Sequence, residues 1–368
     1  MFLVLIFSFL SDILNKIQRK GGIDVTDLWS YLKTVNKPIV LYGIGNGADK
    51  VINRLTSENI KVSGVFSSSG FKKNKSFAGH IIKDYETLKA ELGDMIILVC
   101  FGSHLPEVIQ RVKSLALENE LYIPDVPVVG EVIFDIDFAR NHKESLKAVY
   151  EMLADQASKT AFENIVYFKL TGKPRYIFEI ETEKIEVYNI LKLNNNETFL
   201  DLGAYNGDTV LEFIQNTNGY KFITAIEPDK RNFKKLTLNT GNLQNIACIN
   251  AAISNENGVQ LMSANHGRGN SVSQNTVEVE TLSLDSICSE HIPTFIKMDV
   301  EGNELKAIEG GRAVITTAKP KMHIACYHTS YDLFEIPLKI KELAGDYKIY
   351  LRHHSCFPAW DSNYIFTF

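Results

Sequence analysis

Cysteine is scarce in this sequence, and no two cysteines form a recognisable pair. The 368 residues include five of them, scattered along the chain and mostly inside apolar runs: Cys100, Cys248, Cys288, Cys326 and Cys356. Their odd number and irregular spacing match neither a disulfide framework nor a metal or redox motif. We therefore expect buried, reduced thiols, and the reducing compartment that they imply indicates a cytoplasmic protein.

The chain also lacks an apolar run that is long enough to cross a membrane. Residues 1–10 are strongly apolar, but a membrane-spanning helix needs about 20 such residues. No basic residue precedes the run and no small-residue cleavage site is obvious, which argues against a signal peptide. Helical spacing continues the run through Ile13, Leu14 and Ile17. We expect residues 1–36 to form a helical segment without stable membrane insertion, docked on the protein or on a second copy in a homo-oligomer; membrane contact is the weaker alternative.

Positive charge is not in excess either. Lys and Arg number 39 against 44 Asp and Glu, which gives a net charge of −5. This balance does not favour a nucleic-acid partner. The length suits two domains of ordinary size, and a hydrophobic content of 45% is enough for substantial cores.

Residues 37–130 have the pattern of a Rossmann-like α/β domain. An apolar strand at 38–42 leads into a glycine loop, Gly43-Ile-Gly45-Asn-Gly47, and then into a helix. Further strands are expected at 62–66 and 95–101. The second strand ends in three serines, where an NAD enzyme would carry an acidic residue. We therefore expect no intact NAD site here. The glycine loop and Gly102-Ser103 resemble the small N-terminal domains of sugar-modifying acyltransferases.

Residues 131–175 are expected to form a helical linker. Leu146, Val149, Tyr150 and Leu153 have the spacing of one buried helix face. Pro174 ends this pattern, because the residue before a proline avoids helical geometry. We expect the linker to pack the two domains together, with a second domain at 176–368.

The second domain is organised around residues 198–209, Thr-Phe-Leu-Asp-Leu-Gly-Ala-Tyr-Asn-Gly-Asp-Thr. A buried strand leads into a glycine turn and then into the N-terminus of a helix, which predicts a nucleotide-type cradle in which backbone N–H groups approach the ligand. The next strand, 222–226, ends in Glu227-Pro228-Asp229, where an acidic residue can accept hydrogen bonds from ribose hydroxyls. The spacing suits S-adenosylmethionine as well as a dinucleotide.

From residue 198 onward, strands and helices alternate regularly. Strands are expected at 198–202, 222–227, 246–251, 295–300, 321–327, 347–353 and 363–368, and helices at 208–215, 230–239, 304–317 and 331–344. Residues 258–263 and 276–282 form an inserted pair joined by the polar loop 265–271. Seven strands with intervening helices predict an open, mostly parallel α/β sheet with helices on both faces. The last two strands are separated by a short loop and should pair antiparallel.

Several motifs in order resemble those of FkbM-type methyltransferases, over roughly residues 145–368. They are Asp201-Leu-Gly-Ala-Tyr-Asn-Gly-Asp-Thr209, Glu227-Pro-Asp229, Val279-Glu-Thr-Leu-Ser-Leu-Asp285, Ile296-Lys-Met-Asp-Val-Glu-Gly302 with Glu304, Tyr327-His328 and Leu351-Arg-His353. The resemblance implies a class I methyltransferase fold with strand order 3-2-1-4-5-7-6. It also implies S-adenosylmethionine-dependent O-methylation, often of sugars or natural products. The N-terminal domain is not part of the usual family core.

The cofactor site is expected at the carboxyl ends of the first strands of this sheet. Asp201 and the backbone from Gly203 to Gly207 would hold the methionine end, Glu227 the ribose, and Ala251 with its neighbours would flank the adenine. The full set of expected cofactor-binding residues is Asp201, Gly203, Ala204, Tyr205, Gly207, Asp208, Thr209, Glu227, Pro228, Asp229, Ala251 and Asp299.

The expected acceptor side uses Lys297, Asp299, Glu301 and His328 as catalytic residues. Strand alternation puts Lys297 and Asp299 on one face, although Lys297 could serve only as an ion-pair partner. Asp299 and His328 end neighbouring strands and can approach one another. A histidine near its ordinary pKa of ~6.5 is mostly neutral at pH 7.5. We therefore expect His328, supported by Asp299, to remove the acceptor proton.

A metal site is not expected. Asp299, Glu301 and His328 could supply ligands, but they lack a specific metal spacing. His353 and His354 should lie further away, and His323 should start its strand at the opposite end of the sheet.

Together these patterns predict an S-adenosylmethionine-dependent O-methyltransferase that acts on a hydroxyl of a saccharide or a small natural-product-like metabolite. Two alternatives remain open at this point. One is an NAD(P)-linked sugar-modifying enzyme that uses the first domain, and the other is a non-enzymatic cofactor-binding interaction protein.

Overall fold

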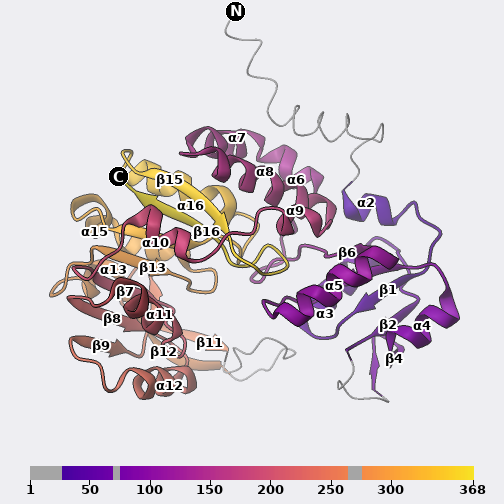
Figure 1. Ribbon diagram of the computed structural model, residues 1–368, viewed down its shortest axis with the longest axis horizontal. Coiled ribbons are helices and arrows are strands. Elements are labelled where there is room, and N and C mark those ends of the chain that lie inside the picture. The colour runs from indigo at the N-terminus through magenta and orange to yellow at the C-terminus, as the bar shows by residue number, and fades with distance from the viewer. Residues whose placement is uncertain (1–26, 69–74, 264–275) are drawn as a thin grey trace, which may run out of the picture.

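The computed structural model describes residues 27–68, 75–263 and 276–368, and contains two large sheets that follow one another along the chain (Figure 1). Residues 1–26 of the expected N-terminal helical segment and the polar loop at 265–271 lie outside the described residues. A short helix, α2 (Leu28–Leu32), opens the described part, and the Asp27 carboxylate accepts a hydrogen bond from the Ser30 N–H at its start. None of the helices in the described ranges is both long and apolar enough to span a membrane.

The first sheet has six strands in the order β3-β4-β2-β1-β5-β6. All neighbours pair in parallel except β3 and β4. The strands are β1 (Ile39–Tyr42), β2 (Gly64–Phe66), β3 (Ser76–Phe77), β4 (His80–Lys83), β5 (Ile96–Val99) and β6 (Glu120–Tyr122). Helices α3 (Asn46–Ser57), α4 (Tyr85–Leu92) and α5 (Pro106–Glu118) connect them. Every residue of β1 and β5 is buried, as expected for parallel strands at the centre of a sheet.

Packing accounts for two glycines, one in the loop after β1 and one in the first turn of α3. A Cβ atom on Gly43, whose φ is +107°, would lie 2.5 Å from the ring of Phe101. A Cβ atom on Gly47 would lie 2.5 Å from the carbonyl oxygen of Cys100. Glycine is thus required here for the loop to pack against the end of β5, whether or not a ligand binds.

Four helices follow, over the range in which a helical linker is expected. They are α6 (Ile136–Asn141), α7 (Lys143–Met152), α8 (Gln156–Thr171) and α9 (Arg175–Phe178), and they lie above and between the two sheets in Figure 1. Asp135 and Asp155 cap α6 and α8 by accepting backbone hydrogen bonds. Leu146 and Val149 are buried in a hydrophobic cluster that also contains side chains of both sheets. The helices therefore pack against both sheets through one continuous core.

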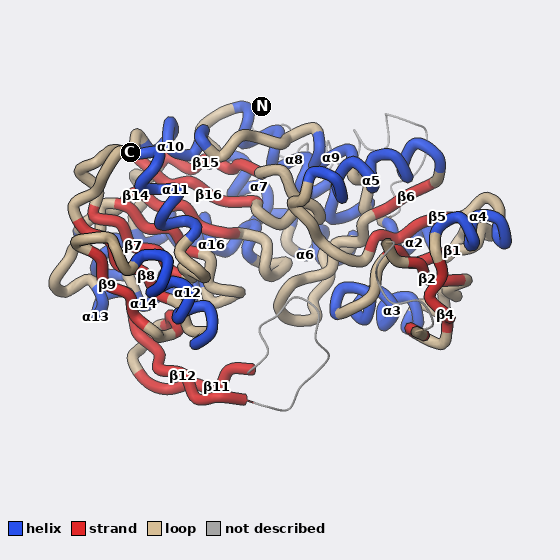
Figure 2. The backbone as a smooth tube through the Cα atoms, turned by 60° about the horizontal axis from the view of Figure 1, so that its bottom comes forward, coloured by secondary structure: helices blue, strands red, loops and turns tan. Residues whose placement is uncertain are grey.

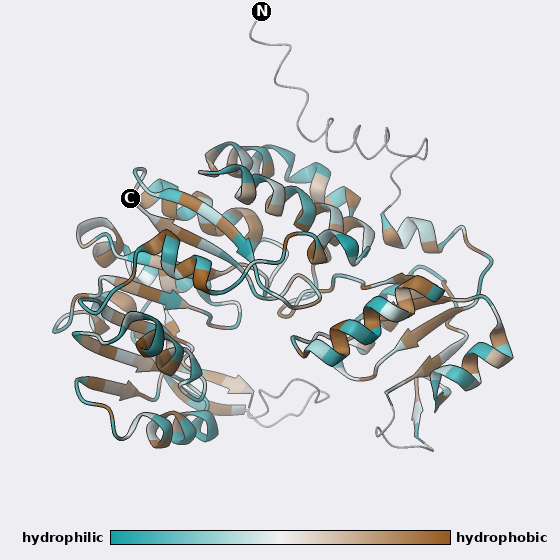
Figure 3. Ribbon diagram, viewed as in Figure 1, coloured by the Kyte–Doolittle hydropathy of each residue, from teal (hydrophilic) through white to brown (hydrophobic). Residues whose placement is uncertain are grey.

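The second sheet has seven strands in the order β15-β16-β14-β13-β7-β8-β9, which confirms the expected strand order. Only β16 runs antiparallel to its neighbours. The strands are β7 (Thr198–Leu202), β8 (Phe222–Ile226), β9 (Ile246–Ile249), β13 (Phe295–Met298), β14 (Lys321–Ala325), β15 (Lys348–His353) and β16 (Ser362–Thr367). Hydrophobic residues concentrate in the strands of this sheet, as Figure 3 shows.

The helices of this part are α10 (Ile185–Leu191), α11 (Asp208–Thr217), α12 (Lys230–Thr240), α13 (Leu284–Ile287), α14 (Glu304–Gly310), α15 (Arg312–Thr317) and α16 (Asp332–Leu343). The single helix expected over 304–317 is therefore wrong. Gly311, with φ −111° and ψ 16°, interrupts it, and a Cβ atom there would lie 2.5 Å from Leu284. Glycine permits this close contact with α13.

A small side sheet lies beside the main one (Figure 2). Strands β11 (Gly258–Ser263) and β12 (Thr276–Ser283) are antiparallel, as the inserted pair is expected to be. A third strand, β10 (Ala252–Ser254), pairs in parallel with β12 and was not expected. It begins at Ala252, just beyond the strand expected over 246–251, where the chain changes from the main sheet to the side sheet.

Candidate active site

The glycine turn after β7 brings the backbone of two neighbouring strands into close contact. Gly203 has φ +82°, and a Cβ atom there would lie 1.9 Å from the carbonyl oxygen of Asp299, just beyond β13. Gly207, with φ +88°, precedes the first residue of α11 and packs against Leu236 and Thr240. Both positions therefore need glycine to shape the turn.

Most N–H groups of this turn are already paired inside the protein. Gly203 and Ala204 donate to the carbonyl of Ile226, and Gly207 donates to the carbonyl of Ala204. The Tyr205 N–H donates to the Glu227 carboxylate at 2.9 Å. These four N–H groups are thus occupied in the structure, and the ligand-binding role of this backbone stays a prediction. The acidic side chains beside the turn can also contact a ligand.

Asp201 is buried in the middle of the second sheet beside Lys297, its partner in register on β13. The Lys297 ammonium lies 3.7 Å from Asp201 and 3.8 Å from Asp299, and donates to the Gly203 carbonyl at 3.3 Å. Both carboxylate oxygens of Asp201 lack a hydrogen-bond donor within the described residues. Burial raises the pKa of Asp201 to about 6, although Lys297 acts in the opposite direction. Lys297 is thus an ion-pair partner of both aspartates.

Glu227 follows β8 and is held by two backbone donors. Its carboxylate accepts hydrogen bonds from the Tyr205 and Asp229 N–H groups, both at 2.9 Å. Burial raises the pKa of Glu227 to about 7, although these hydrogen bonds lower it. Each carboxylate oxygen keeps a second lone pair, so Glu227 can still accept hydrogen bonds from a ligand.

The other expected cofactor residues have identifiable structural roles. Asp229 caps α12 by accepting from two backbone N–H groups, and Asp208 accepts from the Thr209 N–H at the start of α11. Ala251 is completely buried. Its neighbour Asn250 donates to the carbonyls of Glu227 and Pro228, which fixes the end of β9 against that of β8. The adenine role of Ala251 stays a prediction.

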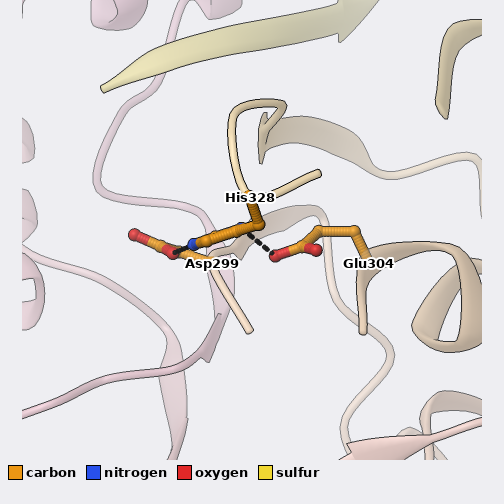
Figure 4. A group of neighbouring side chains, drawn as sticks. All are labelled: Asp299, Glu304 and His328. Atoms are coloured by element: carbon orange, nitrogen blue, oxygen red, sulfur yellow. Dashed lines mark ion pairs between the residues drawn. The ribbon is translucent and has the colours of Figure 1, made fainter. Parts of the chain in front are cut away.

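His328 lies between two acidic groups, the buried Glu304 and the half-buried Asp299 (Figure 4). Its Nε2 is 3.3 Å from an oxygen of Asp299, which confirms that the two residues meet. Its Nδ1 is 3.0 Å from an oxygen of Glu304, the first residue of α14. The Glu304 side chain is 1% exposed and also accepts from the Val300 N–H. The sequence analysis did not predict Glu304 as a partner of His328, because an acidic residue in the first turn of a helix looks like an ordinary capping residue.

The two carboxylates decide the charge of His328. Burial alone would lower its pKa, but Glu304 and Asp299 outweigh burial and raise the pKa of His328 well above its ordinary value. Lys297 and His328 in turn lower the pKa of Asp299, against the effect of burial. The direction of this pKa shift favours the imidazolium over the neutral histidine that is expected at pH 7.5. An imidazolium between two carboxylates is therefore the favoured form of the ligand-free site.

One ligand atom from each of Asp299, Glu304 and His328 lies within 4.8 Å of the others. However, the two carboxylates face different ring nitrogens, at opposite edges of the imidazole in Figure 4. The lone pairs of the two nitrogens point away from each other, so these three residues cannot all bind one ion through this arrangement. The geometry favours a charge-paired chain.

Further polar groups surround this chain. The Tyr327 hydroxyl donates to Asp299 at 3.2 Å, and Glu301, whose side chain is 73% exposed, lies 3.7 Å from His328 Nε2. His323 is the third residue of β14 and pairs in register with Lys297, so its expected place at the far end of the strand is wrong. His353 ends β15, and His354 directly follows it and donates through Nδ1 to the carbonyl of Thr182.

Comparisons with known proteins agree with this fold. Residues 201–353 match the family model for the methyltransferase FkbM domain. The solved structure of a methyltransferase FkbM from Methylobacillus flagellatus KT is similar over 97% of this chain and 99% of its own, with 21% identity and a TM-score of 0.72, which shows a shared fold. A precorrin-6y C5,15-methyltransferase from Geobacter metallireducens GS-15 aligns with 51% of this chain and 94% of its own at 12% identity. Its TM-score of 0.33 is too low to show a shared overall fold. No curated protein matches the chain.

The family match covers β7 to β15, and with them Asp201, Glu227, Asp299 and His328. The similarity to the solved structure extends over both sheets. The chain therefore contains a methyltransferase FkbM domain at residues 201–353.

Proposed function

We propose that the protein transfers a methyl group from S-adenosylmethionine to a hydroxyl group of a saccharide or a small natural-product-like metabolite. The observation that carries this proposal is the chain Glu304–His328–Asp299, which lies next to Asp201 and Lys297. One end of the site offers carboxylates suited to a cationic, hydroxyl-bearing cofactor. The other end offers a charge-paired carboxylate suited to an acceptor hydroxyl.

The residues present fit S-adenosylmethionine. Both oxygens of the buried Asp201 carboxylate are without a hydrogen-bond donor in the described structure, and an ammonium group would satisfy them. Glu227 keeps lone pairs for the two ribose hydroxyls while backbone donors fix its orientation. Asp201 and Glu227 end neighbouring parallel strands, so one ligand can reach both. When bound, this cofactor would supply an electrophilic methyl group on a sulfonium sulfur.

Asp299 is the proposed proton acceptor. As the new O–CH₃ bond forms and the S–CH₃ bond breaks, the acceptor oxygen becomes an oxonium, a far stronger acid than any carboxylic acid. A carboxylate with a lowered pKa can therefore still take this proton, provided that it is correctly placed. His328 and Tyr327 hold the Asp299 carboxylate in position. Glu301, at the exposed edge of the site, can contact the acceptor.

The alternative NAD(P)-linked reaction has less support. One glycine in the loop after β1 and one in the first turn of α3 are required for packing against Phe101 and Cys100. The strand that would carry a ribose-binding acid is followed by Ser67 and Ser68, and the Ser68 hydroxyl pairs with that of Tyr42. These residues offer no charged group to a nicotinamide cofactor.

Removal of the Glu227 carboxylate tests the cofactor site. Charge-assisted hydrogen bonds contribute about 1.5–3 kcal/mol, so Glu227→Ala should weaken S-adenosylhomocysteine binding at least tenfold in calorimetry. Glu227→Gln retains one acceptor oxygen for the turn but loses the charge, and should show a similar loss. Unchanged affinity in both variants, with thermal unfolding like that of the wild type, would refute this site.

The raised pKa of Glu227 also predicts how binding depends on pH. Only the ionised carboxylate can accept from both ribose hydroxyls, and its pKa of about 7 in the ligand-free protein leaves it mostly protonated at pH 6. Affinity for S-adenosylhomocysteine should therefore rise about tenfold between pH 6 and pH 8. Asp201, with a pKa of about 6, contributes in the same direction. Glu227→Gln should remove most of this dependence, and an affinity that falls with rising pH would contradict the assignment.

A further inference from the structure

The stretch between β6 and α6 joins the N-terminal sheet to the methyltransferase domain. Residues 126–132, here called the connecting segment, lie outside the family match and contact it directly. The Val129 N–H donates to the carbonyl of His328 at 2.9 Å. The Ser330 hydroxyl donates to the carbonyl of Val132 at 2.6 Å. The connecting segment thus holds the backbone on which His328 is carried.

The same segment also lies against the turn that carries Glu301. A Cβ atom on Gly302, which has φ +88°, would lie 3.2 Å from the Val129 side chain. Glu301 itself has φ 52°, so this turn is tightly shaped. Val129 therefore contacts both the loop after β13 and the loop after β14. These are the two loops that present Glu301 and His328.

Lys50, on helix α3 next to the N-terminal sheet, also binds the connecting segment. Its ammonium group donates to three carbonyls of this one segment: Pro127 at 2.8 Å, Val128 at 3.3 Å and Gly130 at 3.0 Å. An ammonium group has three donors, and here all three converge on seven residues of chain. Lys50 is half-buried, and this burial lowers its pKa. The three hydrogen bonds of Lys50 therefore hold the connecting segment in place against α3.

We propose that Lys50 is a positioning residue of the methyltransferase site, which holds residues 126–132 against the loops that carry His328 and Glu301. The N-terminal sheet then forms part of the acceptor side of this site instead of a second catalytic centre. A second contact supports this arrangement, because Ser103 and Phe357 exchange two backbone hydrogen bonds between the N-terminal sheet and the loop after β15. The inference rests on the proposed acceptor site at Asp299 and His328.

The test uses the full chain with S-adenosylhomocysteine bound. Lys50→Met keeps the length of the side chain but removes all three donors. Hydrogen exchange of peptides that cover 126–132 should become at least tenfold faster, and the imidazole NMR resonance of His328 should shift. Lys50→Arg should restore both observables. Lys89→Met, which removes a hydrogen bond to Asn119 in the same N-terminal sheet region, is the matched control and should change neither.

Two results would overturn the inference. Unchanged exchange at 126–132 and an unchanged His328 resonance in Lys50→Met would show that Lys50 does not position the site. Equal effects in Lys89→Met would show only a general loosening of the N-terminal sheet. Failure of the proposed function is separate, because it would appear as an unchanged cofactor affinity of Glu227→Ala. The exchange comparison can also be made on the ligand-free protein.

Discussion

Asp299→Asn is expected to lower kcat for methyl transfer about 10²–10⁴-fold, the usual contribution of a positioned proton acceptor. The amide keeps the size of the side chain and can still contact Tyr327 and His328, but it cannot take the acceptor proton. The measurement is the rate of label transfer from a methyl-labelled cofactor to an extract of hydroxylated metabolites, followed by mass spectrometry. Affinity for S-adenosylhomocysteine should change much less than kcat.

Glu301→Gln is the matched control for this variant. Glu301 also faces His328 Nε2, but its side chain is 73% exposed, so water screens its charge. We expect a change of a few-fold at most. An Asp299→Asn enzyme with nearly full activity would contradict the proton-transfer role. Wild-type activity that disappears with a chelator and returns with Mg²⁺ or Mn²⁺ would favour a metal-assisted reaction instead.

Gly203→Ala is expected to destabilise the protein by roughly 3 kcal/mol or more and to abolish cofactor binding. The new methyl group would have to occupy a position 1.9 Å from the Asp299 carbonyl oxygen, so the turn after β7 or the end of β13 must move. The left-handed φ of +82° adds a cost of about 1–2 kcal/mol. Urea unfolding monitored by circular dichroism measures the change.

Gly79→Ala separates the two contributions. Gly79 has nearly the same φ, +80°, but a Cβ atom there would have no neighbour within 4 Å. This variant should therefore lose only about 1–2 kcal/mol, the conformational cost, and should bind cofactor normally. Equal destabilisation of the two variants would mean that the close approach of Gly203 to Asp299 does not constrain the site.

The sequence predicted the sheet and the meeting of its functional ends for a physical reason. Buried parallel strands appear as continuous apolar runs, and their carboxyl ends must lie on one edge of the sheet. Asp201 and Glu227 follow two such runs and end adjacent strands, β7 and β8. Asp299 and His328 follow two others and meet at 3.3 Å. These contacts follow from strand order alone.

The charge of the site could not be predicted in the same way. It depends on Glu304, which reaches His328 from the start of α14, and no periodic pattern reveals that contact. His323 was misplaced because the strand expected over 321–327 already ends at Ala325, which puts His323 at its centre. Lys50 and the connecting segment meet over a separation of about 80 residues, through hydrogen bonds to backbone carbonyls that leave no trace in side-chain type.

A crystal structure of the protein with S-adenosylhomocysteine would show directly where the cofactor binds. We expect that the amino-acid end of the ligand lies at Asp201, that the ribose hydroxyls donate to Glu227, and that the sulfur atom faces Asp299. A ligand bound at the loop after β1, or a ligand in the second sheet that contacts neither Asp201 nor Glu227, would contradict this expectation.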